Sequence, residues 1–296
     1  MAAEIAAESA VEHGVTPGEY ILHHLTFWQN HKPASVVDFS VINIDSVFWS
    51  VLLGVVVCWA MWAAARKASS GVPGRFQAAL EILVEFVDGQ AKGIVHSAQS
   101  RKFVAPLALT VFIWVILMNT MDLLPVDLLP LLWQTLSGNQ HAYMRVVPTA
   151  DLSITMGLSI SVLLLCLFYS IKIKGLGGWA HELVTAPFGS SKNPIFAILL
   201  GVVNFAMQIV EFIAKTISHG MRLFGNMYAG ELLFLLIALM GGAWGTLGLG
   251  GSLVLALLQI VAGWAWAVFH ILIIVLQAFV FMMLTLVYIG QAHDHH

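Results

Sequence analysis

Long apolar stretches are the feature that most limits what this chain can fold into. Five of them, at about residues 45–65, 104–121, 152–171, 194–240 and 252–289, contain few charged residues. Each is long enough for a helix that crosses a bilayer, which needs about 17 to 25 mostly apolar residues. Charged residues are only 10% of the whole sequence, against about 25% in soluble domains. The sequence therefore predicts an all-α integral membrane protein with five membrane-crossing helices.

The segments between the apolar stretches complete the expected layout. Residues 1–44 are polar and irregular, and we expect them to form an external N-terminal segment ahead of a single membrane domain at 45–296. Residues 73–97 differ from both, because Phe76, Leu80 and Val87 recur at helical spacing among charged residues. This pattern predicts an amphipathic helix that lies at the membrane interface.

Basic residues predict the orientation. Under this topology, nine of the thirteen Lys and Arg residues lie on one side of the membrane: Arg66, Lys67, Arg75, Lys92, Arg101, Lys102, Lys172, Lys174 and Lys192. The positive-inside rule makes that side cytoplasmic. We therefore expect an external N-terminus, a cytoplasmic C-terminus and the amphipathic helix on the cytoplasmic face.

The last two apolar stretches are too long for upright spans. As single helices, residues 194–240 and 252–289 would be ~70 Å and ~57 Å long, whereas the hydrocarbon core is ~30 Å thick. They must either tilt steeply or break, with Gly220 and Gly225 as candidate breaks. The Gly-rich connection at 241–251 is short, so the two helices are expected to be antiparallel neighbours.

Two charged residues inside residues 194–240 point to a function. A charge at the bilayer centre costs roughly 2.5 to 3.5 kcal/mol, so it normally faces a partner or a water-filled cavity. Arg222 keeps its charge at any biological pH, whereas Glu231, nine residues later, can gain or lose a proton. This combination indicates a protein that handles protons or cations.

Polar residues on the last apolar stretch support the same interpretation. At ~100° per residue, His270, Gln277 and Tyr288 share one helix face. One antiparallel register places Gln277 at the depth of Arg222 and His270 at the depth of Glu231. Purely structural explanations also stay open for the polar residues other than Arg222. Asn226 and Gln277 could form hydrogen bonds between helices, His270 could be a packing residue, Tyr288 an interfacial anchor, Glu211 and Lys215 an inert pair, and Asp122 and Asp127 helix caps.

Other chemistry is not indicated. The chain has no Walker A, GxSxG or CxxC motif, and we expect no cofactor and no metal site. With a net charge of −3 and no basic run, it gives no reason to expect nucleic acid as a partner. Two rival classes remain: a proton-coupled secondary transporter, although no internal repeat is visible, and a haem protein using His219 and His270.

The segment MRLFGNMYAGELLF at Met221–Phe234 resembles subunit a of bacterial F-type ATP synthase. Similar resemblances occur at Phe269–Ile289, Pro106–Pro130 and Arg145–Gly175. The resemblance implies a non-catalytic, multi-pass subunit of the bacterial inner membrane that couples proton flow to ATP synthesis. It implies two offset aqueous half-channels that pass protons to and from the rotating c-subunit ring. The implied partners are this c-ring, the b-subunit peripheral stalk, the remainder of the ATP synthase and membrane lipids.

The resemblance also implies residue roles. Arg222 matches the family's essential arginine, which attracts the passing carboxylate of the ring and blocks a direct leak. The implied outer half-channel contains Asn226, Glu231, His270 and Gln277. Ser218 and Lys215 match positions towards the cytoplasmic half-channel; Gln208 stands where relatives have glutamate, and Glu211, about one turn later, is its candidate replacement. The further candidate lining residues are Asn119, Asp122, Asp127 and Tyr288.

Overall fold

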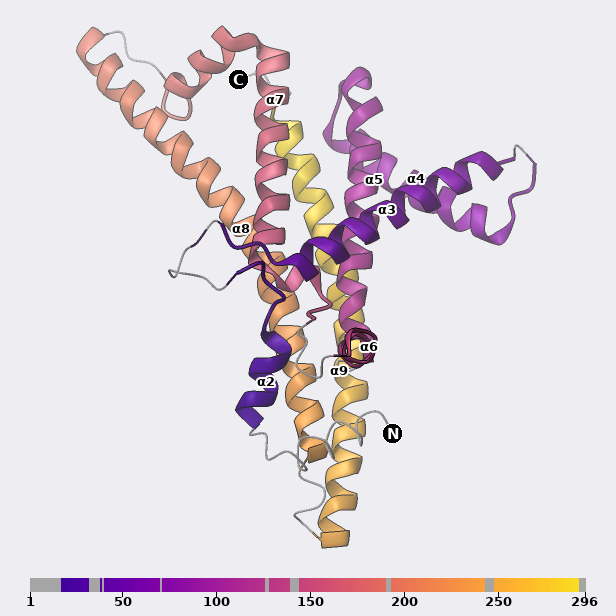
Figure 1. The fold of residues 1–296 in the computed structure, drawn as a ribbon. Helices are drawn as coiled ribbons and strands as arrows, with labels where there is room; N and C mark the ends of the chain where they lie inside the picture. The colour runs from indigo at the N-terminus through magenta and orange to yellow at the C-terminus, as the bar shows by residue number, and fades with distance from the viewer. Residues whose placement is uncertain are drawn as a thin grey trace. The chain divides into compact units, whose positions relative to one another are not determined.

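The computed structural model describes residues 17–31, 38, 40–69, 71–125, 128–138, 144–189, 193–242 and 248–292. Within these ranges the chain is helical, with no strand and one isolated bridge between Gln29 and Asn43. The elements, shown in Figure 1, are α2 (Pro17–Leu25), α3 (Ile44–Lys67), α4 (Arg75–Ile94), α5 (Ala98–Thr120), η1 (Met121–Leu123), α6 (Leu128–Ser137), η2 (Pro148–Ala150), α7 (Leu152–Thr185), α8 (Pro194–Gly242) and α9 (Gly248–Gln291). The predicted all-α fold is confirmed.

Five helices are long and apolar enough to cross a membrane: α3, α5 with η1, α7, α8 and α9. The predicted number of spans is therefore confirmed, although the helices extend beyond the expected bounds. The largest differences are at α5, which begins at Ala98, and at α7, which ends at Thr185. Helix α8 continues through Gly220 and Gly225, so neither glycine breaks it.

Helix α7 shows why one boundary was predicted too short. The expected span ends at about residue 171, and the Gly-rich sequence after it favours a loop, but helical structure resumes after a kink at Gly175, where φ is 72° and ψ is 163°. Glycine adopts positive φ without the steric cost of a Cβ atom. An ion pair of 2.7 Å between Lys174 Nζ and Glu182 Oε1 joins the two sides of the kink.

The N-terminal segment is also more ordered than expected. Helix α2 begins at Pro17, where the missing N–H group costs nothing. Glu19 in the first turn and His23 with His24 in the last turn suit the helix dipole. The backbone N–H of Trp28 then donates to Asp45 Oδ2 at 3.0 Å, which fixes the segment to the start of α3.

The chain forms two compact units, which we describe separately. Unit 1 consists of residues 1–61, 113–154 and 223–278, and unit 2 of residues 62–112, 155–222 and 279–296. In unit 1, the parts of α8 and α9 that belong to it run antiparallel, as expected. Ile237 lies against Gly263 and the amide of Gln259 lies against Gly241, so equal steps along the two helices run in opposite directions.

In unit 2, small residues and polar contacts bring α7, α8 and α9 together. A Cβ atom at Gly220 would lie 2.7 Å from Met156 Sδ and 3.2 Å from the carbonyl oxygen of Thr155, so α8 and α7 touch closely there. Ser159 Oγ donates to the carbonyl oxygen of Thr216 at 2.5 Å.

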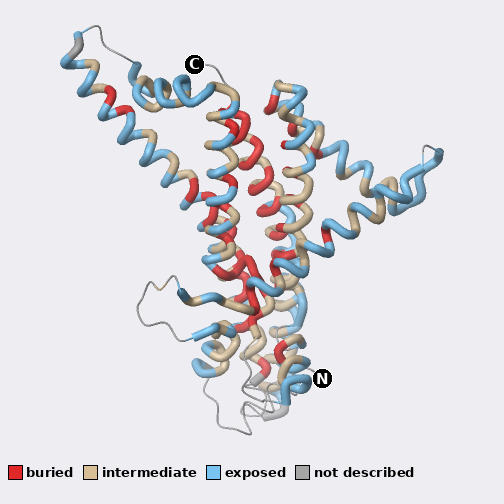
Figure 2. The backbone as a smooth tube through the Cα atoms, turned by 45° about the horizontal axis from the view of Figure 1, so that its top comes forward, coloured by how far each residue is buried: buried red, intermediate tan, exposed pale blue. Residues whose placement is uncertain are grey.

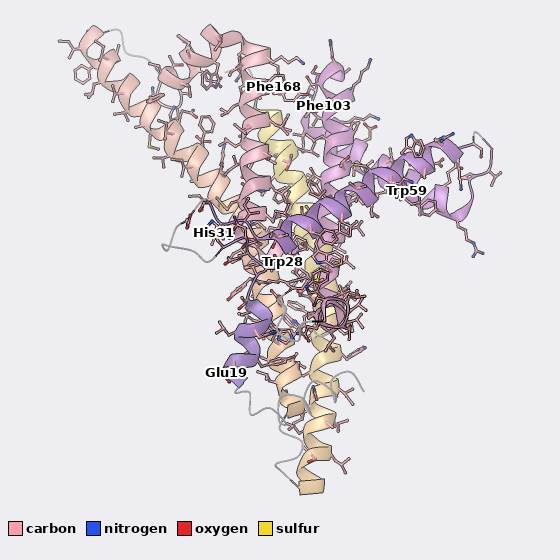
Figure 3. The ribbon with its side chains drawn as sticks, in the orientation of Figure 1. Glu19, Trp28, His31, Trp59, Phe103 and Phe168 are labelled. Carbon is pink, nitrogen blue, oxygen red and sulfur yellow. The ribbon has the colours of Figure 1, made fainter. Side chains whose placement is uncertain are left out.

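Large apolar side chains cover the outside of the helices. Trp59, Phe103 and Phe168 are 65%, 53% and 56% exposed, and Figure 3 shows them projecting from the helices that carry them. Exposed positions also dominate α3 and α4 in Figure 2. Helices with this much exposed apolar surface suit a lipid environment, where an outward-facing apolar side chain costs nothing.

Candidate functional site

A buried ion pair between Arg145 and Glu231 is the centre of the polar site in unit 1. Arg145 Nε donates to Glu231 Oε1 at 3.1 Å and to Oε2 at 3.2 Å, and its terminal nitrogen also contacts Oε2. The side chains are only 3% and 10% exposed. Arginine and carboxylate thus meet in a forked contact, the geometry that guanidinium favours for carboxylates.

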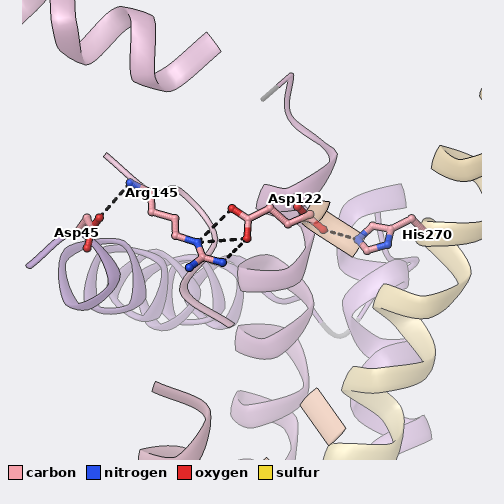
Figure 4. Close-up of polar contacts among 5 residues, drawn as sticks. Asp45, Asp122, Arg145 and His270 are labelled. Carbon is pink, nitrogen blue, oxygen red and sulfur yellow. Dashed lines mark hydrogen bonds and ion pairs between the residues drawn. The ribbon is translucent and has the colours of Figure 1, made fainter. Parts of the chain in front are cut away.

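Neighbouring residues hold Arg145 in place. Figure 4 shows one of these contacts, the hydrogen bond between Arg145 and Asp45. The backbone N–H of Arg145 donates to Asp45 Oδ2 at 3.0 Å, and Asp45 itself is 1% exposed. The guanidinium carbon lies 4.4 Å from the ring centre of Phe27 and 5.6 Å from that of Tyr228. Cation–π contacts of this kind help to hold the guanidinium group in its position against Glu231.

A second polar pair joins α9 to η1, the short helix that follows α5. His270 Nε2 lies 2.7 Å from Asp122 Oδ2, and both side chains are buried, with 0% and 4% exposed. Helix α8 makes room for this pair at Gly230. A Cβ atom there would clash with the His270 ring and would lie 3.1 Å from Asp122 Oδ2. Glycine therefore allows the pair to sit directly beside Glu231 along α8.

A small cavity lies beside Asp122, Arg145 and Glu231 of this network, and His270 does not line it. It has a volume of about 40 Å³ and is lined by Asp122, Arg145, Glu231 and His24, with mostly apolar residues around them. A cavity needs only about 10 to 15 Å³ of such volume to hold a water molecule. The cavity in unit 1 can therefore hold a small number of water molecules among four titratable or charged side chains.

Unit 2 contains a much larger cleft, with a volume of about 1080 Å³. Its walls include Gln208, Glu211, Lys215 and Tyr288. Lys215 Nζ lies 2.5 Å from Glu211 Oε1 and 2.8 Å from Gln291 Oε1. The Lys174–Glu182 pair lines the same cleft.

Comparison with known proteins identifies the chain's relatives. A family model described as ATP synthase A chain matches residues 47–290. ATP synthase subunit a of Acidovorax sp. (strain JS42) is 68% identical over 288 residues, covering 97% of this chain and 100% of that protein. ATP synthase subunit a of Paracidovorax citrulli (strain AAC00-1) is 66% identical over 293 residues, covering 97% of this chain and 100% of that protein. The chain belongs to the ATP synthase subunit a family. The resemblance found in the sequence is thus confirmed.

Within this subunit a family member, the structure brings some predicted site residues together. Glu231, His270 and Asp122 belong to the network of unit 1, but Glu231 contacts Arg145 and His270 contacts Asp122. Gln208, Glu211, Lys215 and Tyr288 line the cleft of unit 2.

The remaining predicted residues lie outside these two cavities. Gln277 is buried, with 9% exposed, and Asn119 is fully buried, with neither side-chain amide atom hydrogen-bonded within the described part of the chain. Arg222 and Asn226 are half-buried on α8, and Ser218 is exposed. Asp127 lies outside the described residues.

Sequence reasoning missed Arg145, Asp45 and His24 as members of the site. In the sequence, Arg145 stands out only as the first residue of a segment that resembles the family, and residue 45 only as the start of an expected span. The available signal was weak: an arginine near a proline, in a segment between two apolar stretches. The Lys174–Glu182 pair was missed because a Gly-rich loop was expected at that place.

Proposed function

We propose that this chain is the stator proton-channel subunit of the membrane sector of ATP synthase. It provides two offset aqueous half-channels that pass protons to and from the carboxylates of a rotating c-ring. The subunit itself performs no bond-making catalysis, and protons moving down the membrane potential supply the energy. A charge crossing the full potential gains about 2.3 kcal/mol per 100 mV. Membership of the subunit a family disfavours the transporter and haem alternatives.

One observation carries this proposal. Each unit contains a cavity that is large enough for water and is lined by titratable side chains, and α8 contributes to both, through Lys215 in unit 2 and Glu231 in unit 1. Arg222 lies between these two residues in the sequence, seven residues after Lys215 and nine before Glu231. Within unit 2, the rise along the helix from Lys215 to Arg222 is about 10 Å at 1.5 Å per residue. A permanent cation between two titratable regions can prevent protons from passing directly from one to the other.

In this proposal, the outer half-channel uses the network of unit 1. Asp122, His270 and Glu231 exchange a proton, while Arg145 keeps the carboxylate of Glu231 oriented. Asn226 and Gln277 extend the path towards Arg222. The cluster holds several interacting acids and bases, so its protons come off in steps that belong to the group rather than to one residue.

The inner half-channel uses the cleft of unit 2. Its size allows bulk-like water, and Glu211, Lys215 and Tyr288 line it. Glu211, about one turn after Gln208, supplies the acidic group that Gln208 lacks. Water then carries the proton most of the way, and the side chains adjust its local concentration.

Orientation and partners belong to the same proposal. The N-terminus is external, the C-terminus is cytoplasmic, and the c-ring and the b-subunit stalk contact the lipid-facing side of the helices. Cysteines introduced at Lys32 and Lys172 should react with an impermeant thiol reagent from opposite faces of the membrane. Labelling of both from one face would contradict this topology.

The decisive experiment is the substitution Arg222→Lys, measured as ATP-driven proton pumping in inverted membrane vesicles. Lysine keeps the charge but lacks the planar fork and can lose its proton. Pumping should be abolished while ATP hydrolysis by the soluble sector continues. Arg222→Ala should in addition allow passive proton leak. Pumping at the parental rate in the Lys variant would refute the proposed role of Arg222.

A further inference from the structure

His219 of α8 is a buried imidazole that the proposed function does not yet use. It is 2% exposed, and neither ring nitrogen has a hydrogen-bond partner among the described residues. His270, which is also buried, has a carboxylate oxygen 2.7 Å from its Nε2. A buried polar group without a partner costs about 1 to 3 kcal/mol, so it calls for an explanation.

Aromatic rings of α9 surround the imidazole within unit 2. Its ring centre lies 3.9 Å from that of Phe281, with an angle of 26° between the planes. The ring of Tyr288 stands edge-on to it, with centres 5.7 Å apart. On the neighbouring residue, Gly220, α8 comes close to Met156 of α7. The imidazole is thus enclosed, and packing alone would be served equally well by a phenyl ring with no polar atoms.

Its position along α8 explains what an imidazole adds. Thr216, one turn before His219, and Tyr288, beside its ring, both line the cleft of unit 2. Arg222 follows one turn later, about 4.5 Å further along the helix. His219 therefore occupies the turn between the end of the cleft and Arg222.

We propose that His219 is a proton relay between the water of the inner cleft and the region of Arg222. A neutral imidazole accepts a proton on one ring nitrogen and releases the proton from the other, so the ring carries no net charge after the transfer. A half-turn of the ring about its Cβ–Cγ bond then restores the starting arrangement. The permanent charge of Arg222 opposes a lasting imidazolium on the same helix, which keeps the residence time of the proton short. This inference rests on the proposed function of the subunit.

The test compares two substitutions that keep different properties of the imidazole, its aromatic packing or its hydrogen-bonding atoms, although neither can relay a proton. His219→Phe keeps an aromatic ring against Phe281 but cannot carry a proton, and His219→Gln keeps hydrogen-bonding atoms but does not titrate. The measurement is ATP-driven pumping by the complete complex in inverted vesicles, divided by the amount of assembled complex. Loss of a positioned acid–base group typically costs a factor on the order of a hundred or more. We expect proton pumping by each variant to fall by at least on the order of tenfold. The loss can be smaller than a hundredfold because water can replace part of the path.

The exposed His96 provides the matched control, since His96→Gln removes an imidazole outside the proposed path and should pump at the parental rate. Parental pumping by His219→Phe would overturn the relay and assign the residue to packing. Parental pumping by His219→Gln would overturn it too, because hydrogen bonding would then be sufficient. If only one variant assembles, that variant decides; failure of both to assemble would assign the residue to packing and overturn the relay.

Arg222→Lys in the same vesicles separates this inference from the proposed function. Normal pumping by the His219 variants together with none by Arg222→Lys would refute the relay alone. Normal pumping by Arg222→Lys would refute the proposed function, whatever the His219 variants do.

Discussion

The two polar regions of the molecule treat charge in different ways. In unit 1 the charged groups are paired with one another, nearly out of contact with solvent, around a cavity of about 40 Å³. The side chains of Arg145 and Glu231 are 3% and 10% exposed. In unit 2 the side chains of Lys215 and Glu211 are 29% and 48% exposed, on the wall of a cleft of about 1080 Å³.

In the proposed function, this difference determines how a proton moves in each region. In the narrow cavity, a proton has to pass between side chains, so the identity of each group and its partner matters. In the wide cleft, water can carry the proton, and one ion pair more or less changes little. The ion pairs of the two regions also differ in their effect on stability. Removing one partner of a buried pair strongly destabilises the protein, whereas exposed pairs contribute about 0 to 1 kcal/mol.

Arg145→Gln should have the largest effect, because it leaves the carboxylate of Glu231 buried without its partner. Breaking a buried ion pair in this way costs about 3 to 5 kcal/mol. The expected result is a marked loss of subunit a from the purified complex and a lower thermal stability of what remains. Lys215→Gln in the cleft is the comparison, with an expected cost of about 0 to 1 kcal/mol.

The double variant Arg145→Gln/Glu231→Gln tests the reason for this loss. Two amides can hydrogen-bond to each other and leave no buried charge, so part of the assembly should return. Proton pumping should stay low, since Glu231 is also a relay in the proposed function. A double variant that assembles no better than Arg145→Gln would show that the uncompensated charge is not the cause.

The next effect concerns the pair Glu231 and His270. Glu231→Gln and His270→Ala should each slow proton entry without creating a leak, because Arg222 still separates the two half-channels. A proton-transfer group typically contributes about 10² to 10⁴ in rate. Passive and ATP-driven proton flux in vesicles would measure both effects. If both single variants translocate protons at the parental rate, neither side chain is a required relay.

Exchange of these two residues is a sharper test of the network. Glu231→His/His270→Glu keeps all its acids and bases within one cluster, next to Arg145 and Asp122. Because such a cluster titrates as a group, the exchanged variant should be partly active and exceed the worse single variant. Activity no higher than that of the worse single variant would mean that each position needs its own partner.

Much of the fold followed from the sequence, because lengths and apolar composition largely determine membrane helices. The register of α8 against α9 was also predictable in unit 1, where both helices are continuous and Gly230 lies against His270. The polar residues inside apolar stretches, such as Glu231, stood out because a charge there is costly. The partners of these residues could not be identified in the same way. Arg145 contacts Glu231 only because the segment before α7 folds back against α8.

Unit 2 shows the same limit from the other side. A Gly-rich sequence predicted a loop, and the Lys174–Glu182 contact across Gly175 could not be anticipated from local pattern. His219 likewise lacks a hydrogen-bond partner among the described residues because α9 places aromatic rings beside it. The sequence does not show which rings these are. The sequence alone identifies many of the polar residues, but it does not predict which of them come into contact when they are far apart in the chain.

The smallest effect is expected for Glu211→Gln, although Glu211 is the proposed replacement for a glutamate of the family's pattern. The Glu211 side chain is 48% exposed, and its ion pair with Lys215 contributes about 0 to 1 kcal/mol, so proton flux should stay within about twofold of the parental rate. A second acidic group, Glu182, lines the same cleft and can maintain the local proton concentration. Glu211→Gln/Glu182→Gln should therefore lower the flux more than either single change, with Gln208→Glu in that background restoring it. A large loss from Glu211→Gln alone would mean that the proton passes through a fixed side chain in unit 2 as well, and the contrast between the two regions would fail.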